Sequence, residues 1–244
     1  MQRLLFMLSL VAAVAASAAT DMDHKGKVIA TVKTAHAGVA ELTCNDVGMW
    51  SFDLKASEDA GRDVVTITCT APNDVKPPQF GVFFRVPGAG VQNVWTSDHS
   101  RDGFHLWPQL WWGWVSRYTS ELAKETPIAV GFNSQERAPV ALACSDAFNQ
   151  LVFGLYADDR TCEIVGRCEF FTKPTAARKS YTVSVMLDRR NGPFADTVRD
   201  CSDWIIARNG FKAAPVPAAA RDPLYSTWYA YLQDVHDKEL EQEA

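Results

Sequence analysis

The sequence lacks the short motifs that mark the commonest metal, phosphate and hydrolase sites. It contains no Cys-x-x-Cys and no His-x-x-x-His pair, so a zinc site of the usual spacing is not expected. A glycine-rich phosphate loop is also absent. Ser51, Ser145 and Ser184 stand outside any Gly-x-Ser-x-Gly context, which argues against a serine hydrolase of the nucleophile-elbow type. We therefore expect no metal and no cofactor.

The sequence also has no excess of basic over acidic residues. The chain has 24 Lys and Arg against 29 Asp and Glu, a formal net charge of −5 at pH 7. A mildly acidic protein is a poor partner for nucleic acid and for anionic membranes, because both carry negative charge. We predict that nucleic acid is not among its partners.

A long apolar run occurs once, at the very start, and has the features of an export signal. Residues 1–3 (Met-Gln-Arg) are basic, residues 4–16 are apolar, and residues 16–19 (Ala-Ser-Ala-Ala) supply the small side chains that a signal peptidase requires. The run is shorter than the about 20 residues that span a bilayer. We predict a signal peptide over residues 1–19, with a retained anchor as the alternative. The mature protein would be secreted or periplasmic, with no membrane association after cleavage.

Six cysteines fall in the predicted mature part, an even number that permits disulfides in an exported chain. They are Cys44, Cys69, Cys144, Cys162, Cys168 and Cys201. Cys162 and Cys168 flank Glu-Ile-Val-Gly-Arg, a spacing that suits closure of a short hairpin or loop. Such a bridge would constrain little chain, so its effect should lie at the low end of the typical ~2–4 kcal/mol. Buried thiols in a stable core are the alternative.

Apolar and polar residues alternate in run after run between residues 28 and 187, the period expected of strands with one buried face. The predicted inward-facing residues are Val65, Ile67 and Cys69; Phe80, Val82, Phe84 and Val86; Leu151, Phe153 and Leu155; and Tyr181, Val183, Val185 and Leu187. Clusters of turn-forming residues, such as ASEDAGRD and APNDVKPP, separate the runs. The pattern predicts antiparallel sheets packed face to face, in a large β-sandwich domain over residues 20–190.

The period changes after residue 190. Four apolar residues recur at helical spacing: Phe194, Val198, Cys201 and Ile205. Pro193 suits the first helical turn and Gly210 suits the left-handed position after the last, so we predict one amphipathic helix. A stiff spacer, AAPVPAAARDP, follows it. Residues 191–222 are thus predicted to connect the sandwich to a second domain.

That second domain is expected to begin with PLYSTWYAYLQ, residues 223–233. Its apolar and aromatic residues leave no polar face, as in a strand that is covered on both sides. Strong helix formers follow it. We interpret residues 223–244 as the first strand and helix of a parallel α/β domain that these residues begin but do not complete.

This order of elements, together with the sequence segments that form them, resembles a known family. The segment from YTVSVMLDRR to DPLYSTWYAYLQDV is similar to the junction between the N-terminal β-supersandwich and the catalytic (β/α)8 barrel of glycoside hydrolase family 36, the bacterial α-galactosidase (melibiase) family. The resemblance is detailed over residues 110–240, and Ser226-Thr227-Trp228 is its most specific motif. It implies a mainly β fold: a large antiparallel β-sandwich (supersandwich), one connecting α-helix and the first β/α unit of a truncated barrel.

The activity that the resemblance implies is retaining hydrolysis of terminal α-galactosides of oligosaccharides, by two aspartates about 5 Å apart. In the family both aspartates lie on later barrel strands, so no residue here is assigned a catalytic role and the chain alone is expected to be inactive. Trp228 matches the tryptophan that lines the sugar subsite, and a rigid indole can stack on the C–H face of a pyranose. Barrel core is the alternative role for Trp228. The family also implies a homo-oligomer.

A second candidate for substrate binding is the tryptophan-rich stretch DHSRDGFHLWPQLWWGW, residues 98–114. Trp111 and Trp112 lie at its centre, and we hypothesise that they contact the oligosaccharide. Packing of the sandwich against a barrel is the alternative. Asp158, Asp159 and Glu163 are carboxylates of the type that glycosidases use, but their position in the sandwich predicts solvated loop residues. The alternative function for the whole chain is a non-catalytic carbohydrate-binding or interaction module.

Overall fold

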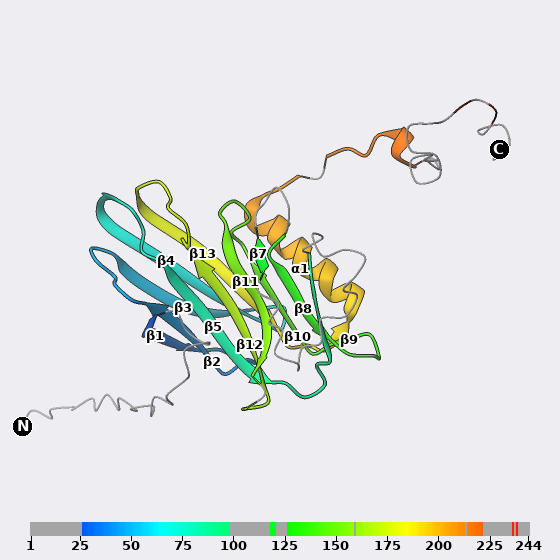
Figure 1. Ribbon diagram of the computed structural model, residues 1–244, viewed down its shortest axis with the longest axis horizontal. Helices are drawn as coiled ribbons and strands as arrows, with labels where there is room; N and C mark the ends of the chain where they lie inside the picture. Colours follow the sequence, from blue (N-terminus) through cyan, green and yellow to red (C-terminus); the bar gives the residue numbers. More distant parts are fainter. Residues whose placement is uncertain are drawn as a thin grey trace, which may run out of the picture. The chain divides into compact units, whose positions relative to one another are not determined.

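The computed structural model describes residues 26–97, 118–120, 126–158, 160–212 and 214–221, together with His236 and Lys238. Two units divide the chain, Met1–Asn209 and Gly210–Ala244. Among the described residues, the first unit carries the strands β1 to β14 and the helix α1 (Figure 1).

The strands are β1 (Lys27–Lys33), β2 (Val39–Cys44), β3 (Ser51–Asp59), β4 (Arg62–Val75), β5 (Phe80–Pro87), β6 (Asn93–Thr96), β7 (Tyr118–Ser120), β8 (Ile128–Phe132), β9 (Arg137–Ala138), β10 (Val140–Cys144), β11 (Leu151–Asp158), β12 (Glu163–Phe170), β13 (Arg178–Asp188) and β14 (Gly192–Pro193). The helices are α1 (Phe194–Asn209) and the short 3-10 helix η1 (Ala218–Arg221).

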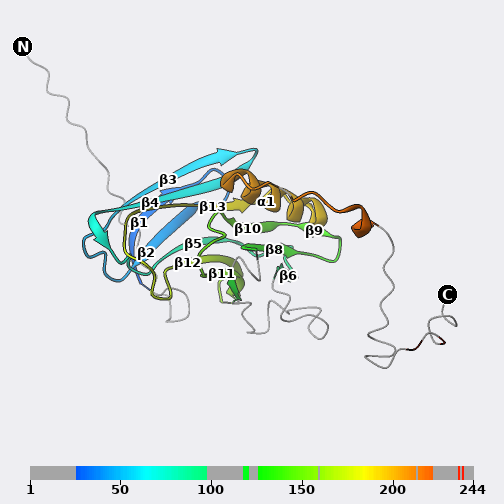
Figure 2. The same cartoon turned by 90° about the horizontal axis from the view of Figure 1, so that it is seen from above.

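Two six-stranded antiparallel sheets form the body of this unit. Sheet A has the order β1-β2-β5-β12-β11-β7, and sheet B has the order β3-β4-β13-β10-β8-β6. A two-stranded ladder of β14 and β9 lies beside them. The sheets form separate layers, with α1 on the sheet B side (Figure 2). The predicted β-sandwich class and the antiparallel pairing are confirmed, whereas the barrel unit falls on residues outside those described.

The core between the sheets contains the residues that the alternation predicted. Thirteen of those inward-facing side chains line it, with Tyr181 at its margin. Phe80 lies at its centre, where its ring stacks on Phe170 at 4.8 Å between centroids and meets Phe52 edge-on at 5.3 Å. Burial of one such ring contributes about 1.5–3 kcal/mol. The period-two pattern therefore identified the correct face of every strand that it was applied to.

The turn between β3 and β4 is tighter than the cluster ASEDAGRD suggested. β3 and β4 pair as far as Asp59 and Arg62, which leaves Ala60 and Gly61 as the loop. Both have positive φ, 52° and 77°, as in the type I′ turn that matches the twist of a hairpin. Ala60 is a poor choice for that conformation, since its Cβ meets the following carbonyl.

The second cluster, APNDVKPP, was predicted to separate strands, and this is wrong for its first half. β4 continues to Val75, which pairs with Arg178 of β13. Pro72 cannot donate a ladder hydrogen bond, and the register shifts between Arg178 and Ser180, so this part of β4 bulges instead of ending.

The predicted helix is present as α1, which packs on β8 and β10. Gly210 adopts φ 64° directly after it, as expected of the left-handed C-terminal position. Its buried face differs slightly from the prediction, because Thr197, Cys201, Trp204 and Ile205 are buried. Phe194 is half-buried at the start, where its ring contacts Phe132 at 4.9 Å between centroids.

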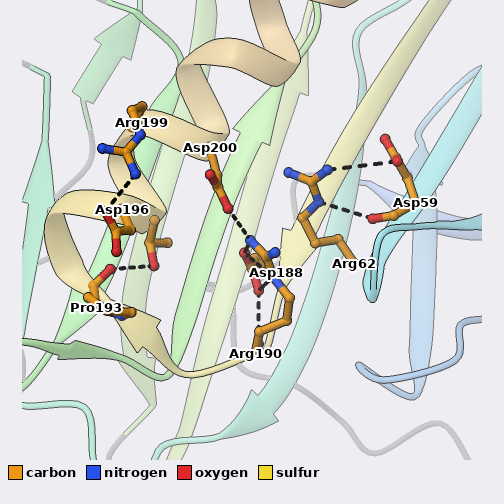
Figure 3. A network of polar contacts seen from close by, with 9 residues as sticks. Asp59, Arg62, Asp188, Arg190, Pro193, Asp196, Arg199 and Asp200 are labelled. Atoms are coloured by element: carbon orange, nitrogen blue, oxygen red, sulfur yellow. Dashed lines mark hydrogen bonds and ion pairs between the residues drawn. The ribbon is translucent and has the colours of Figure 1, made fainter.

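An arginine ties the end of β13 to α1 (Figure 3). Arg190 Nη2 lies 2.6 Å from Oδ2 of the buried Asp188 and 2.7 Å from Oδ2 of Asp200 on the helix. Hydrogen bonding to Asp188 raises the pKa of Arg190. The two carboxylates thus fix the angle at which the chain leaves the sandwich.

The hairpin disulfide between Cys162 and Cys168 is not formed. Cys162 is exposed in the turn before β12, while Cys168 is buried in the core on β12 itself. Six residues of an extended strand span about 20 Å, far beyond the reach of a disulfide. All six cysteines are present as thiols, five of them buried.

Candidate functional site

The turn from β10 to β11 is organised by one carboxylate, Asp146. Its Oδ1 accepts hydrogen bonds from the backbone N–H groups of Phe148 (3.0 Å) and Asn149 (2.9 Å). Its Oδ2 accepts from the Asn149 side-chain amide at 2.6 Å and from the Tyr181 hydroxyl on β13. An aspartate that closes the turn following it in this way forms an Asx turn. Asp146 therefore links the β10–β11 turn to the neighbouring strand.

A hollow of about 400 Å³ opens beside this turn. Three elements line it: the β10–β11 turn, the middle of β13 and the C-terminal end of α1. The lining side chains that a ligand would meet are Asp146, Phe148, Asn149, Tyr181, Arg208 and Asn209. The helix end is fixed there because Asn209 Nδ2 donates to the Ser145 carbonyl at 2.9 Å.

The hollow combines an aromatic ring with charged and amide groups at its rim. Phe148 is 63% exposed, unusual for a phenylalanine. Arg208 is exposed, and its guanidinium lies 5.2 Å from the ring centroid of Trp204. A ring beside hydrogen-bonding groups suits a ligand with one apolar face and several hydroxyls.

The tyrosine of the hollow, Tyr181, is not suited to act as a general acid near neutral pH. Burial, together with the negative charge of Asp146, raises the pKa of Tyr181 well above its usual value. Tyr181 therefore stays protonated, and its hydroxyl donates a hydrogen bond to Asp146. Asp146 is 7% exposed and already accepts four hydrogen bonds, so the arrangement is suited to binding rather than to catalysis.

A second polar cluster lies on the face of β12 that points away from the sandwich core. Arg167 and Glu169 are 3% and 2% exposed and form an ion pair with each other. The Arg167 guanidinium also lies 5.9 Å from the Phe83 ring centroid. Arg167 Nε and Nη1 and Glu169 Oε2 are buried with no hydrogen-bond partner among the described residues. Buried charges of this kind usually have partners.

The expectation that Asp158 and Glu163 are solvated loop residues is wrong: Asp158 is buried, and Glu163 is the partly exposed first residue of β12, paired with Asp158. Asp158 closes β11, is 6% exposed and lies 3.6 Å from Arg85, which also lies 3.7 Å from Glu163. The hydrogen bond from Arg160 is the main reason why the pKa of Asp158 is lowered. A carboxylate whose pKa is lowered cannot act as the general acid of a glycosidase, which needs a raised pKa.

The residues predicted to bind substrate, Trp111, Trp112 and Trp228, lie outside the described residues, as do Asp159 and the predicted strand over residues 224–232. Sequence reasoning missed the Asp146 hollow. The signal available was the Ser-Asp-x-x-Asn sequence directly after the buried run of β10, which is typical of an Asx turn.

Within the part of the chain that the structure describes, no group of three His, Cys, Asp or Glu side chains is placed to hold a metal ion. No helix among the same residues is long and apolar enough to cross a membrane.

The described part thus belongs to the class of two-layer antiparallel β proteins. No family model matches the chain, and no curated protein matches it. Among solved structures, the Slr1438 protein from Synechocystis sp. PCC 6803 is similar over 68% of this chain, with 10% identity and a TM-score of 0.38. The match spans 66% of that protein's length, a little under two thirds.

Proposed function

We propose that this chain is the N-terminal, non-catalytic part of an exported α-galactosidase-like glycoside hydrolase. The observation that carries the proposal is the order of elements in the first unit: a two-sheet sandwich whose last long strand, β13, is followed by the two-residue β14 and then by α1. That is the order expected from the sequence resemblance at residues 178–209. The Pro- and Ala-rich spacer follows in the sequence.

The carboxylates of the sandwich support a non-catalytic role for it. Asp63, Asp146, Asp158, Glu169 and Asp188 are buried, and each is already engaged by hydrogen bonds or arginine contacts. A retaining glycosidase needs one carboxylate open to the anomeric carbon and another that carries a proton. In the proposed enzyme both are supplied by later barrel strands, and Trp228 stacks on the galactose ring.

The test compares two proteins. The first is this chain alone; the second is this chain extended by whatever the gene encodes after Ala244. Hydrolysis of a chromogenic α-galactoside by the extended protein alone, with the anomeric configuration retained, is the expected result. Hydrolysis by the 244-residue chain would contradict the proposal, and so would an extension without paired aspartates on predicted barrel strands.

A specific observation favours a second candidate function, non-catalytic carbohydrate binding at the Asp146 hollow. Phe148, Asn149 and Arg208 line the same hollow, which sets an aromatic ring together with groups that can hydrogen-bond to sugar hydroxyls. A polar hollow of this size holds a mono- or disaccharide better than a flat apolar ligand.

Binding of galactose and raffinose to the chain, measured by calorimetry or by NMR titration, tests this candidate. Phe148→Ala and Arg208→Ala should each weaken binding about tenfold or more, because each removes a contact worth ~1.5 kcal/mol. Met49→Ala is the matched control, since Met49 is 58% exposed and does not line the hollow. Equal weakening by all three variants, or an absence of saturable binding, would refute the site.

A further inference from the structure

The outward face of sheet B is only partly covered by the helix. α1 packs on β8 and β10, and the sheet continues beyond them through β13, β4 and β3 (Figure 1). Ile67 and Val183 belong to the core between the sheets, so the residues next to them along each strand point outward. Of the outward-facing residues, Thr70, Ser180 and Thr182 are exposed. This part of sheet B therefore presents side chains to solvent.

Hydroxyl groups form rows across this exposed part of the sheet. The strand register sets residues of β3, β4 and β13 directly beside one another in three successive rows of three. Seven of the nine residues are Ser or Thr, and the other two, Asp53 and Lys55, form an ion pair at 2.7 Å. Charged residues are common at exposed positions, yet apart from that pair the rows contain none. We call this surface the hydroxyl face; its rows are Ser51–Thr70–Ser180, Asp53–Thr68–Thr182 and Lys55–Thr66–Ser184.

The hydroxyls of the face hold one another in place. Thr66 Oγ1 lies 2.9 Å from Ser184 Oγ, Ser51 Oγ lies 2.8 Å from Thr70 Oγ1, and the two hydroxyls of the middle row are 3.5 Å apart. Two hydroxyls that bond to each other use one of their two hydrogens, so one donor and several lone pairs remain for a ligand. Threonine also has few χ1 rotamers. Such a preordered set of donors and acceptors loses little side-chain entropy when a ligand binds.

The hydroxyl face is continuous with the hollow beside Asp146. Thr182 and Ser184, which end two of the rows on β13, also line the hollow. From there the rows lead across β4 to β3, on the side of β13 away from β10. A ligand that occupies the hollow therefore meets further hydroxyls if it is long enough to leave it.

We propose that the hydroxyl face and the hollow form one extended binding site for a linear, uncharged oligosaccharide whose terminal sugar lies in the hollow. The inference rests on the second candidate function and extends its ligand from one or two sugars to a chain. Each sugar of such a chain carries hydroxyls that can pair with the donors and acceptors of the rows. The face has no net charge and the whole chain has a net charge of −5, so a polyanion is a poorer match than a neutral chain.

The test measures, by calorimetry, the binding of linear galactan oligosaccharides of two, four and six sugar units to the full chain. The dissociation constant should fall about tenfold or more from the shortest to the longest, because only the longer chains reach the rows outside the hollow. A galacturonic acid oligomer of six units, with a carboxylate on every sugar, should bind more weakly than the neutral six-unit chain. Equal affinity for all three neutral lengths would overturn the inference but leave the hollow as a sugar site, whereas no binding at any length would overturn both.

A double variant, Thr68→Val/Thr70→Val, separates the face from the hollow. Neither residue lines the hollow, and valine keeps the shape and the strand preference of threonine while it removes the hydroxyl. The variant should bind the six-unit chain roughly tenfold more weakly and the two-unit chain unchanged, whereas Phe148→Ala should weaken both. Thr31→Val is the matched control, because Thr31 is an exposed strand threonine of sheet A. Unchanged binding of the six-unit chain by the double variant, or equal weakening of the two lengths, would overturn the proposal.

Discussion

Asp63 should be among the most important single residues for the stability of this sandwich. It lies at the start of β4 in sheet B and is 0% exposed. Its carboxylate accepts hydrogen bonds from three successive backbone N–H groups in the β1–β2 hairpin of sheet A. The contacts are 2.9 Å to Ala35, 3.0 and 3.1 Å to His36, and 2.6 Å to Ala37. One side chain thus anchors the hairpin of one sheet to a strand of the other.

The loss of stability in Asp63→Ala depends on which of these backbone N–H donors water can reach once the carboxylate is gone. Ala37 is buried, so its N–H would lose its partner without replacement, which costs about 2–3 kcal/mol. Ala35 and His36 are exposed, so water recovers most of their hydrogen bonding and each adds about 0.5–1 kcal/mol. The total is about 3–5 kcal/mol. Asp63→Asn keeps the shape of the side chain but loses its charge, and it should lower the free energy of unfolding by about half as much as Asp63→Ala.

Urea unfolding followed by tryptophan fluorescence and circular dichroism is the assay. With a slope of about 2 kcal/mol/M, the midpoint should fall by roughly 1.5–2.5 M for Asp63→Ala. Asp53→Ala is the control, because Asp53 is an exposed strand residue whose ion pair with Lys55 is also exposed, and its effect should stay under about 0.5 kcal/mol. An Asp63→Ala protein within 1 kcal/mol of the parent would refute the reasoning.

Three further outcomes are expected from the same unfolding assay. Ala60→Asn should raise stability by about 0.5–1 kcal/mol because asparagine tolerates the φ of 52° in the type I′ turn, and a loss of stability would contradict that turn assignment. Arg190→Met should lower the free energy of unfolding by about 3–5 kcal/mol, because it leaves the charge of the buried Asp188 unpaired. Asp200→Asn should lower it by less than about 1 kcal/mol, because Asp200 is half-exposed. Equal effects of the two variants would contradict the arrangement in Figure 3. Asp158 has a folded pKa below its unfolded value of about 3.9, so its contribution is present above that pH and is lost as pH falls through the lowered pKa. Asp158→Asn should flatten the acid limb of stability against pH, and an unchanged acid limb would show that Arg160 does not hold this carboxylate.

The hollow beside Asp146 shows how a candidate site can depend on tertiary structure. Its lining comes from residues 145–149, 181–184 and 208–209, which are separated by more than thirty and by more than twenty positions in the chain. The sequence contains the local signal for the Asx turn, but nothing local indicates that Tyr181 and Arg208 lie beside it. The predicted substrate-binding residues Trp111, Trp112 and Trp228 remain predictions.

The sequence by itself determined the features that depend on neighbouring residues. The two-residue period placed Phe80, Val183 and Leu187 on the buried face, and Gly210 marked the end of the helix, because side-chain direction and backbone preference repeat over a few positions. Tertiary structure alone decided which strands lie opposite each other. That arrangement buried Asp158 instead of leaving it solvated, and it placed Cys168 in the core while Cys162 stayed exposed in the turn before β12. Sheet order and register set such partnerships, and neither is contained in a local pattern.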